Sequence, residues 1–448
     1  MTKKSAICGA LCAGLLALAL AAPLCSSAQT DSPPTSPDIS KRVEDLEKEL
    51  AELKAQLAAQ KPAEPAAAPA TPAASAVVAS TAPPPTSAPT GLAGLLGPTT
   101  ISGFVDTYYG YNSNQPSGRV NQYHNFDINS GQFGLNMLEL VADKTPDATA
   151  SRVGYHIALG FGQAINQINA TEPGPGFPGV TTTTNFDQYL KEGYLEYLAP
   201  VGKGLQINVG KFVTPAGAEV IESKDNWNYT RGILFAWAIP YFHYGVSGKY
   251  TFNSKFALTG YLVNGWNNSV DNNSGKTTGF SAAWTPNSKF TLIQNYLVGP
   301  EQLDFNGNLR HLYDTVLIYN PTAKLSLMAN YDYGHDHLQN SLSSVHWSGI
   351  AGYIKYAMND KWTVAGRGEY FNDHDGFETG ATQNLSEFTF TLQRMLAAKI
   401  ISRLEFRRDM SSADVFPYRS GPPNHSPVDS QNTVTLGLIY AFSSADAK

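Results

Sequence analysis

Charged side chains recur at every second position in several segments that are otherwise apolar or aromatic. In 398–409, for example, Arg403 and Arg407 alternate with Leu404 and Phe406. The charged positions of this kind are Glu192, Glu196, Lys361, Arg367, Glu369, Lys399, Arg403, Glu405 and Arg407. Because successive side chains of a β-strand point to opposite faces, each segment predicts one charged face and one apolar face. Burying such charges in the core of a soluble sandwich would be costly, so the charged faces are expected to be wet.

These charges support two chemical interpretations. If the segments form a closed wall, Glu192 and Glu196 lie nearly opposite the basic residues of 362–409, and the field between them would orient dipolar solutes. Alternatively, the charges pair with one another along the wall and only keep it wet. Neither interpretation involves catalysis.

Three other clusters contain residue types that bind metals or catalyse hydrolysis. They are His-Asp-His at 335–337, Asp-His-Asp at 373–375 and Asn-His-Ser at 424–426. The first two fall in predicted loops, where polar clusters are common, so no metal site is predicted there. The third lies in a proline-rich loop and provides no base that a third group orients. We therefore predict no catalytic residue, no metal and no cofactor, and expect a protein that is not an enzyme.

The elements that position these residues are predicted to be β-strands. Sixteen candidate segments follow residue 99, and most are long enough to cross a bilayer at a tilt. They are 101–111, 130–142, 151–163, 188–198, 204–212, 244–252, 255–265, 275–285, 289–298, 309–319, 324–334, 345–357, 362–372, 383–393, 398–409 and 432–442. The connections between them alternate between long and short without exception. The short ones carry turn residues such as Asn253-Ser254 and Asn359-Asp360.

This alternation of connections is typical of outer-membrane barrels, which have short turns at one end and long loops at the other. The sequence therefore predicts an all-β fold, a 16-stranded antiparallel transmembrane β-barrel over 99–442, with a short tail at 443–448. Charged residues make up 15% of the chain, fewer than the ~25% of soluble domains. The net charge of −6 argues against a nucleic-acid partner.

The first 98 residues divide into three predicted segments. Residues 1–28 have a basic start, an apolar run and a small-residue cleavage site, as in a secretory signal peptide. Leu24 before Cys25 argues against a lipoprotein, and all three cysteines of the chain lie in this removed segment. Residues 61–98 are rich in proline and alanine and are expected to form a disordered linker.

Between them, 39–60 is predicted to be an N-terminal coiled-coil helix, because its apolar positions alternate in steps of four and three residues. The run from Arg42 to Glu47 resembles the trimerisation motif of short coiled coils. The residues of the predicted trimer seam are Arg42, Val43, Leu46, Glu47, Leu50, Leu53 and Leu57. A helix this short is marginal alone in water, so it is expected to need partner chains. A trimer is predicted, with a dimer as the alternative.

The run TPAGAEVIESKDNWNYTRGILFAWAIPYFHYGV, at 214–246, is similar to the corresponding region of the OmpL-like β-barrel porin family. With the strand pattern, the resemblance covers about 99–442 and implies an outer-membrane porin. In trimeric porins of sixteen strands the third long loop narrows the barrel, and here that loop is 213–243. The residues that would then stand at the constriction are Glu219, Glu222, Lys224, Asp225 and Arg231. The alternative is a loop folded over the mouth or against a neighbouring subunit.

The last predicted strand resembles the C-terminal signal that the barrel-assembly machinery reads. Leu438, Tyr440 and Phe442 supply its alternating apolar and aromatic positions, although SSADAK follows them.

The whole pattern predicts a porin in the outer membrane of a Gram-negative bacterium, with its coiled coil in the periplasm. It would form a water-filled channel for passive diffusion of small hydrophilic solutes. The expected partners are outer-membrane lipid, the barrel-assembly machinery and other copies of the chain in a homotrimer, with peptidoglycan as a candidate. Two alternatives remain: a structural anchor whose coiled coil tethers toward the cell wall, and an outer-membrane barrel enzyme.

Overall fold

The computed structural model describes residues 97–170, 187–339, 343–419 and 426–447, and β-strands account for most of them. The strands are β1 (Thr100–Asn112), β2 (Gln132–Lys144), β3 (Val153–Phe161), β4 (Leu190–Ala199), β5 (Leu205–Val213), β6 (Phe242–Asn253), β7 (Phe256–Val263), β8 (Thr277–Asn287), β9 (Phe290–Gly299), β10 (Arg310–Tyr319), β11 (Leu325–His337), β12 (Ser344–Ala357), β13 (Trp362–Asp373), β14 (Gln383–Ala397), β15 (Ile400–Ser411) and β16 (Ser430–Ser443). The predicted signal peptide and coiled coil, the predicted linker up to residue 96, and His425 lie outside the described residues.

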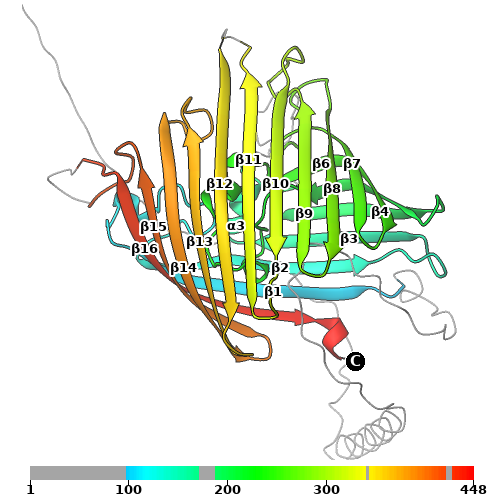
Figure 1. Ribbon diagram of the computed structural model, residues 1–448, viewed down its shortest axis with the longest axis horizontal. Coiled ribbons are helices and arrows are strands. Elements are labelled where there is room, and N and C mark those ends of the chain that lie inside the picture. Colours follow the sequence, from blue (N-terminus) through cyan, green and yellow to red (C-terminus); the bar gives the residue numbers. More distant parts are fainter. Residues whose placement is uncertain (1–96, 171–186, 340–342, 420–425, 448) are drawn as a thin grey trace, which may run out of the picture. The chain divides into compact units, whose positions relative to one another are not determined.

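These strands form one closed antiparallel barrel, in which each strand pairs with the next along the chain (Figure 1). β16 closes the ring against β1, with Phe442 opposite Gly103 and Val434 opposite Tyr111. A closed sheet has no free edge, so the backbone groups of every strand are paired within the wall. The predicted 16-stranded antiparallel barrel is confirmed.

Alternation of side chains gives the wall two different faces. In β16, Leu436, Leu438 and Tyr440 are exposed on the outer face, whereas Thr435 and Ile439 are buried. An outer face of large apolar and aromatic side chains suits contact with lipid. Among the described residues, no helix is both long enough and apolar enough to cross a membrane.

Asparagine side chains build short turns at one end of the barrel. Asn253 Oδ1 accepts a hydrogen bond from Lys255 N at 2.8 Å, and Asn287 Oδ1 accepts one from Lys289 N at 2.9 Å. Asparagine favours this local bond to the backbone two residues on, which reverses the chain within a few residues. The long connections therefore all lie at the opposite end, which we call the long-loop end.

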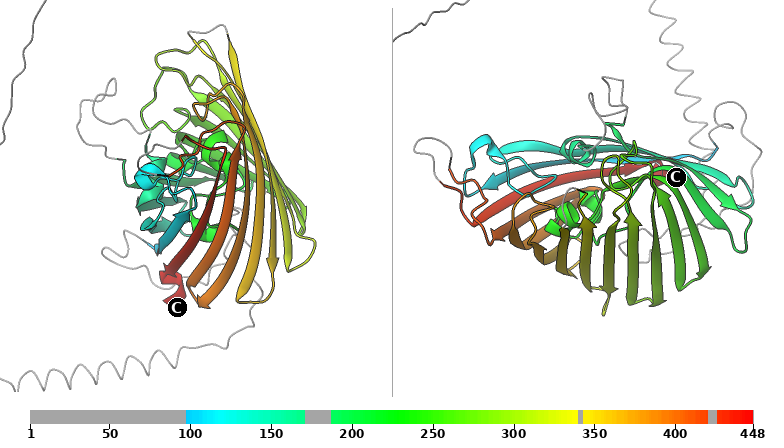
Figure 2. Two further views of the ribbon diagram at one scale, coloured as in Figure 1. Left: turned by 90° about the vertical axis from the view of Figure 1, so that its left-hand side faces the viewer. Right: turned by 90° about the horizontal axis from the view of Figure 1, so that it is seen from above.

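The interior of the barrel contains an apolar core, made largely by these long connections. Figure 2 shows helical segments of the long connections within the ring of strands. Loop 3 (214–241) contains η2 (Ser223–Asp225) and η3 (Leu234–Ala238), and loop 2 begins with α3 (Gln163–Ile168). Phe126 of loop 1 (113–131), Phe235 of loop 3 and Phe416 of loop 8 (412–429) are all buried. They pack in one cluster with Phe371 of β13. Apolar burial therefore favours a position of loop 3 inside the barrel.

Candidate pore and constriction

Loop 3 is hydrogen-bonded to widely separated strands of the wall. Asn295 Nδ2 on β9 donates to Pro215 O at 3.0 Å. Asp106 on β1 accepts a hydrogen bond from Ser223 Oγ at 2.5 Å. Because β1 and β9 lie on different sides of the ring, the loop is held within the barrel and not only over its mouth.

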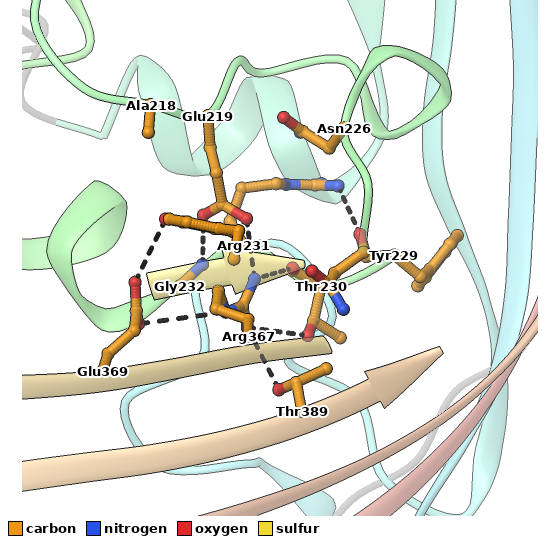
Figure 3. A network of polar contacts seen from close by, with 12 residues as sticks. Ala218, Glu219, Asn226, Tyr229, Thr230, Arg231, Gly232, Arg367, Glu369 and Thr389 are labelled. Atoms are coloured by element: carbon orange, nitrogen blue, oxygen red, sulfur yellow. Dashed lines mark hydrogen bonds and ion pairs between the residues drawn. The ribbon is translucent and has the colours of Figure 1, made fainter. Parts of the chain in front are cut away.

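Arg367, a fully buried side chain on β13, is the centre of this attachment (Figure 3). Its Nη1 lies 2.7 Å from Glu219 Oε1 and donates to Thr230 O at 2.6 Å, both in loop 3. Its Nε lies 2.7 Å from Glu387 Oε1 on the neighbouring strand. Breaking a buried pair by removing one partner costs ~3–5 kcal/mol. Arg367 therefore fixes loop 3 to the wall.

Two wall carboxylates accept hydrogen bonds from the backbone of loop 3. Glu405 on β15 accepts from Tyr229 N at 2.5 Å and from Thr230 N at 2.9 Å. Glu369 on β13 accepts from Ile233 N. A Cβ at Gly232 would collide with the Glu369 carboxylate. The backbone approaches the carboxylate this closely because glycine has no Cβ, and a larger residue would force Glu369 to move.

Two further arginines of β15 bind carbonyl groups of the loop. Arg403 Nη2 donates to Asn226 O at 2.7 Å, and Arg407 Nη1 donates to Arg231 O at 2.7 Å. Arg407 also lies 2.7 Å from Asp409 Oδ1. We call the inner-face charges of β13 to β15 the charged sector: Arg367, Glu369, Glu387, Arg403, Glu405, Arg407 and Asp409. Every member is buried.

A buried histidine of loop 1, His124, binds the charged sector. His124 Nδ1 lies 2.6 Å from Asp127 Oδ2, and His124 Nε2 lies 2.9 Å from Asp409 Oδ2. Burial and the charge of Arg407 act to lower the pKa of His124, but these two carboxylates outweigh them and raise it to about 9. Trp237 Nε1 of loop 3 donates to Tyr123 O of loop 1 at 3.3 Å. The charged His124 therefore joins loop 1 to the charged sector.

The inner face of β5 to β9 is different, and the strand register defines it. Gln206 pairs with Lys249, which pairs with Thr259, then Ser281, then Asn295, whose side chain reaches loop 3. We call the half-buried polar inner-face residues of these strands the neutral sector: Gln206, Asn208, Lys249, Thr259, Ser281, Thr285 and Thr291. They share this face with the apolar or aromatic residues Ala257, Tyr261, Ala283 and Ile293. Lys249 is the one charged member of the set, so this part of the wall carries hydroxyl and amide groups without a dense charge.

A cavity of about 730 Å³ lies under loop 3 toward the short-turn end. Lys191 on β4 contacts Glu139 and Glu222 and lies 3.4 Å from Glu192 Oε2. Burial opposes ionisation of Glu222, but the charge of Lys191 lowers its pKa overall. Glu192 Oε2 also lies 3.6 Å from His156 Nε2, so this edge of the cavity is a network of paired acidic and basic groups.

The structure corrects two of the predicted wall positions. Lys361 is exposed in the turn between β12 and β13, and Lys399 lies in the turn between β14 and β15. There Lys399 pairs with Asp446 at 2.7 Å. Since β13 begins at Trp362 and β15 at Ile400, both lysines lie in turns at the rim. Lys399 nevertheless lines the cavity under loop 3, whereas Lys361 is exposed.

The other predicted wall and constriction charges contact protein groups, where an open lumen would leave them in contact with water. Glu192 and Glu196 are buried on β4, where Glu192 Oε1 accepts a hydrogen bond from Val213 N at 3.2 Å. Lys224 lies 2.5 Å from Asp225, and both line the cavity under loop 3. The observed contacts of the basic residues are pairings along the wall and with loop 3.

The Arg231 side chain is buried within loop 3. Its Nη1 donates to Tyr229 O at 2.7 Å, and its guanidinium lies 4.6 Å from the centre of the Phe126 ring. Arg231 therefore stabilises the loop in its buried position.

Sequence reasoning missed several residues that hold loop 3. Asp106 lies in a predicted strand and alternates there with apolar positions, so its inward direction was available from the sequence. Lys191 gave no such signal, because strand pairing is irregular between Leu190 and Glu192 and both 191 and 192 are buried. A bulge shifts the alternation by one residue, which a regular pattern does not predict.

The predicted loop position of the cluster at 335–337 also needs correction. His335 and His337 lie within β11, and Asp336 pairs with Arg310 at 3.0 Å. Among the described residues, no group of three or more His, Cys, Asp or Glu side chains is arranged to hold a metal ion.

Comparison with known proteins agrees with this architecture. The family model described as "Putative beta-barrel porin-2, OmpL-like" matches residues 98–442. The anion-selective porin from Comamonas acidovorans is 11% identical, with a TM-score of 0.51 over 77% of this chain and 99% of that chain. The outer membrane channel DcaP of Acinetobacter baumannii is 12% identical, with a TM-score of 0.49 over 77% and 97%. No curated protein matches the sequence. At such identities, the likeness to solved structures shows the fold.

Proposed function

Because the chain belongs to the OmpL-like β-barrel porin family, we propose that it is an outer-membrane porin through which small hydrophilic solutes diffuse passively along the neutral sector. The supporting observation is that the neutral sector is half-exposed, whereas the charged sector is buried under loop 3. Hydroxyl and amide groups keep a path wet without binding ions tightly. Selection then depends on width and hydrogen bonding, not on catalysis.

In this proposal the arginines of β13 and β15 contribute little to ion selection. Arg367 and Arg407 each contact carboxylates, and Arg403 bonds to loop carbonyls. A charge that is paired and covered produces a weaker field in the lumen than an exposed one.

The proposed orientation follows the loop lengths. Porins expose their long loops to the outside and their short turns to the periplasm. The barrel chain both begins and ends at the short-turn end, where Ser102 of β1 is paired with Ser443 of β16. The predicted coiled coil, 39–60, would then lie in the periplasm, with peptidoglycan as a candidate partner.

We further propose a homotrimer, supported by the Arg42 to Glu47 motif. The outward positions of Leu438, Tyr440 and Phe442 on β16 suit recognition by the barrel-assembly machinery. Mass measurement of the purified protein in detergent tests the trimer. A monomeric mass would contradict it.

Planar-bilayer recording of the purified protein separates the porin from its two rivals. We expect discrete conductance steps, together with swelling of proteoliposomes in small neutral solutes. An absence of both would favour a structural anchor that tethers toward the cell wall. For a barrel enzyme, the candidate is His425, and hydrolase activity lost in His425→Ala would favour it over the porin.

A further inference from the structure

A row of three histidines crosses the outer face of the barrel near the long-loop end. His311 of β10 is paired with His335 of β11, which is paired with His346 of β12. Their ring centroids are separated by 5.8 Å and 4.7 Å. All three side chains are at least partly exposed. Because they lie outside the barrel, neither the interior core nor the proposed channel uses them.

Two tyrosines orient the outer members of this row. Tyr296 OH lies 2.7 Å from His311 Nδ1, and Tyr333 OH lies 3.0 Å from His346 Nδ1. A phenol that donates to Nδ1 leaves the ring proton on Nε2. His311 and His346 therefore each have an N–H donor directed to other partners.

The same tyrosines place the row relative to a bilayer. Tyr296, Tyr313 and Tyr333 are paired in order across β9, β10 and β11, two residues closer to the short turns than the histidines. Tyrosines in such rows mark the boundary between the apolar core of a membrane and its headgroups. The histidine row lies just beyond this boundary, at the level of lipid headgroups.

The charged and titratable groups near the row have hydrogen-bond partners other than its three imidazole rings. Asp336 belongs to the inner face and pairs with Arg310 at 3.0 Å. Asp375 accepts a hydrogen bond from the backbone N of His346 at 2.8 Å. His337, two residues from His335, lies 3.1 Å from Ser344 Oγ through its Nδ1.

We propose that His311, His335 and His346 bind the phosphate group of a membrane lipid headgroup. Imidazole N–H groups donate to phosphate oxygens, and hydrogen bonds to a charged acceptor are stronger than neutral ones. The three rings lie side by side, and no described group of three metal-binding side chains converges on one point. The position beyond the tyrosine row favours a lipid over free phosphate.

Native mass spectrometry of the delipidated full-length protein in detergent tests this proposal. The probes are lipid A with both phosphates and the same lipid with its phosphates removed. We expect a preference of at least about fivefold for the phosphorylated lipid in the unaltered protein. We expect the preference to vanish in the variant His311→Asn/His335→Asn/His346→Asn. The matched control, His374→Asn, alters a histidine whose side chain is 84% exposed in loop 7 and should keep the preference.

A second variant keeps the test informative if the triple variant misfolds. If the triple variant fails to fold, Tyr333→Phe removes only the hydroxyl beside His346 and should lower the preference about twofold. An equal preference in the unaltered and altered proteins would overturn the proposal. Competition by inorganic phosphate at the same concentration would identify a free-phosphate site, and loss of the preference in EDTA would identify a metal site. Either result would also overturn it.

Discussion

The charged sector and the neutral sector both lie on the inner face of one barrel, but only the charged sector is buried under loop 3. In β13 to β15, the arginines and carboxylates are at most a few per cent exposed, because loop 3 covers them and bonds to them. In β5 to β9, hydroxyl and amide groups remain half-exposed. The difference shows that charge on an inner face does not predict its exposure, because contact with loop 3 decides which inner-face groups stay accessible. In the proposed function, solutes meet the sector that loop 3 leaves uncovered.

Substitution of Arg367 should have the largest effect, because it removes the main attachment of loop 3 to the charged sector. In Arg367→Met, Glu219 and Glu387 lose their buried partner, and we expect ~3–5 kcal/mol of destabilisation in urea unfolding. Loop 3 should loosen and single-channel conductance should rise. The matched control is Lys249→Met, at a half-exposed position of the neutral sector, where stability should change by less than ~0.5 kcal/mol. Equal effects of the two substitutions would contradict the distinction between the sectors.

A methyl group at Gly232 should also weaken the attachment of loop 3 to β13, but with a smaller effect than the loss of Arg367. Gly232→Ala forces its Cβ against the Glu369 carboxylate, so we expect ~1–3 kcal/mol of destabilisation and a lower Tm. Gly260→Ala on β7 is the control, because a Cβ there meets nothing within 4 Å. A Tm unchanged by Gly232→Ala would show that loop 3 is not seated tightly on β13.

Alkaline pH should weaken the attachment of loop 1 to the charged sector through His124. The pKa of His124, about 9, lies above its ordinary value of ~6.5. Its stabilising charge is therefore fully present below pH ~6.5 and is lost as the pH rises through about 9. Hydrogen exchange in loop 1 should accelerate between pH 8 and 10, after correction for the intrinsic rate.

The variant His124→Asn should remove this additional pH dependence, whereas His374→Asn should keep it. Corrected exchange that stays constant across this range in the unaltered protein would contradict the role of the charged histidine.

The smallest predicted effect is a change in ion selectivity when Lys249, the one cation of the neutral sector, is replaced. Lys249→Met should raise the cation-to-anion permeability ratio by less than about twofold, because it removes a positive charge from the lumen wall. The reversal potential in a salt gradient measures this ratio. An unchanged ratio would place Lys249 outside the conducting path.

The sequence predicted the barrel well because its strands follow the two-residue repeat and its connections alternate in length. Arg367 and Arg403 were correctly expected on an inner face for the same reason. Their burial could not be predicted, since it depends on contacts with loop 3, which is more than a hundred residues away in the chain. Lys191 was missed because a bulge interrupts the alternation.

Cysteine accessibility tests the central claim most directly. The three native cysteines all lie within residues 1–28, so each introduced cysteine would be the sole thiol of a chain from which that segment is removed. Ser281 of the neutral sector and Thr389 of β14 both lie on the inner face, but Thr389 is fully buried. A water-soluble thiol reagent should reduce the bilayer conductance of Ser281→Cys and leave that of Thr389→Cys unchanged. Block of Thr389→Cys with no effect on Ser281→Cys would contradict a conducting path along the neutral sector.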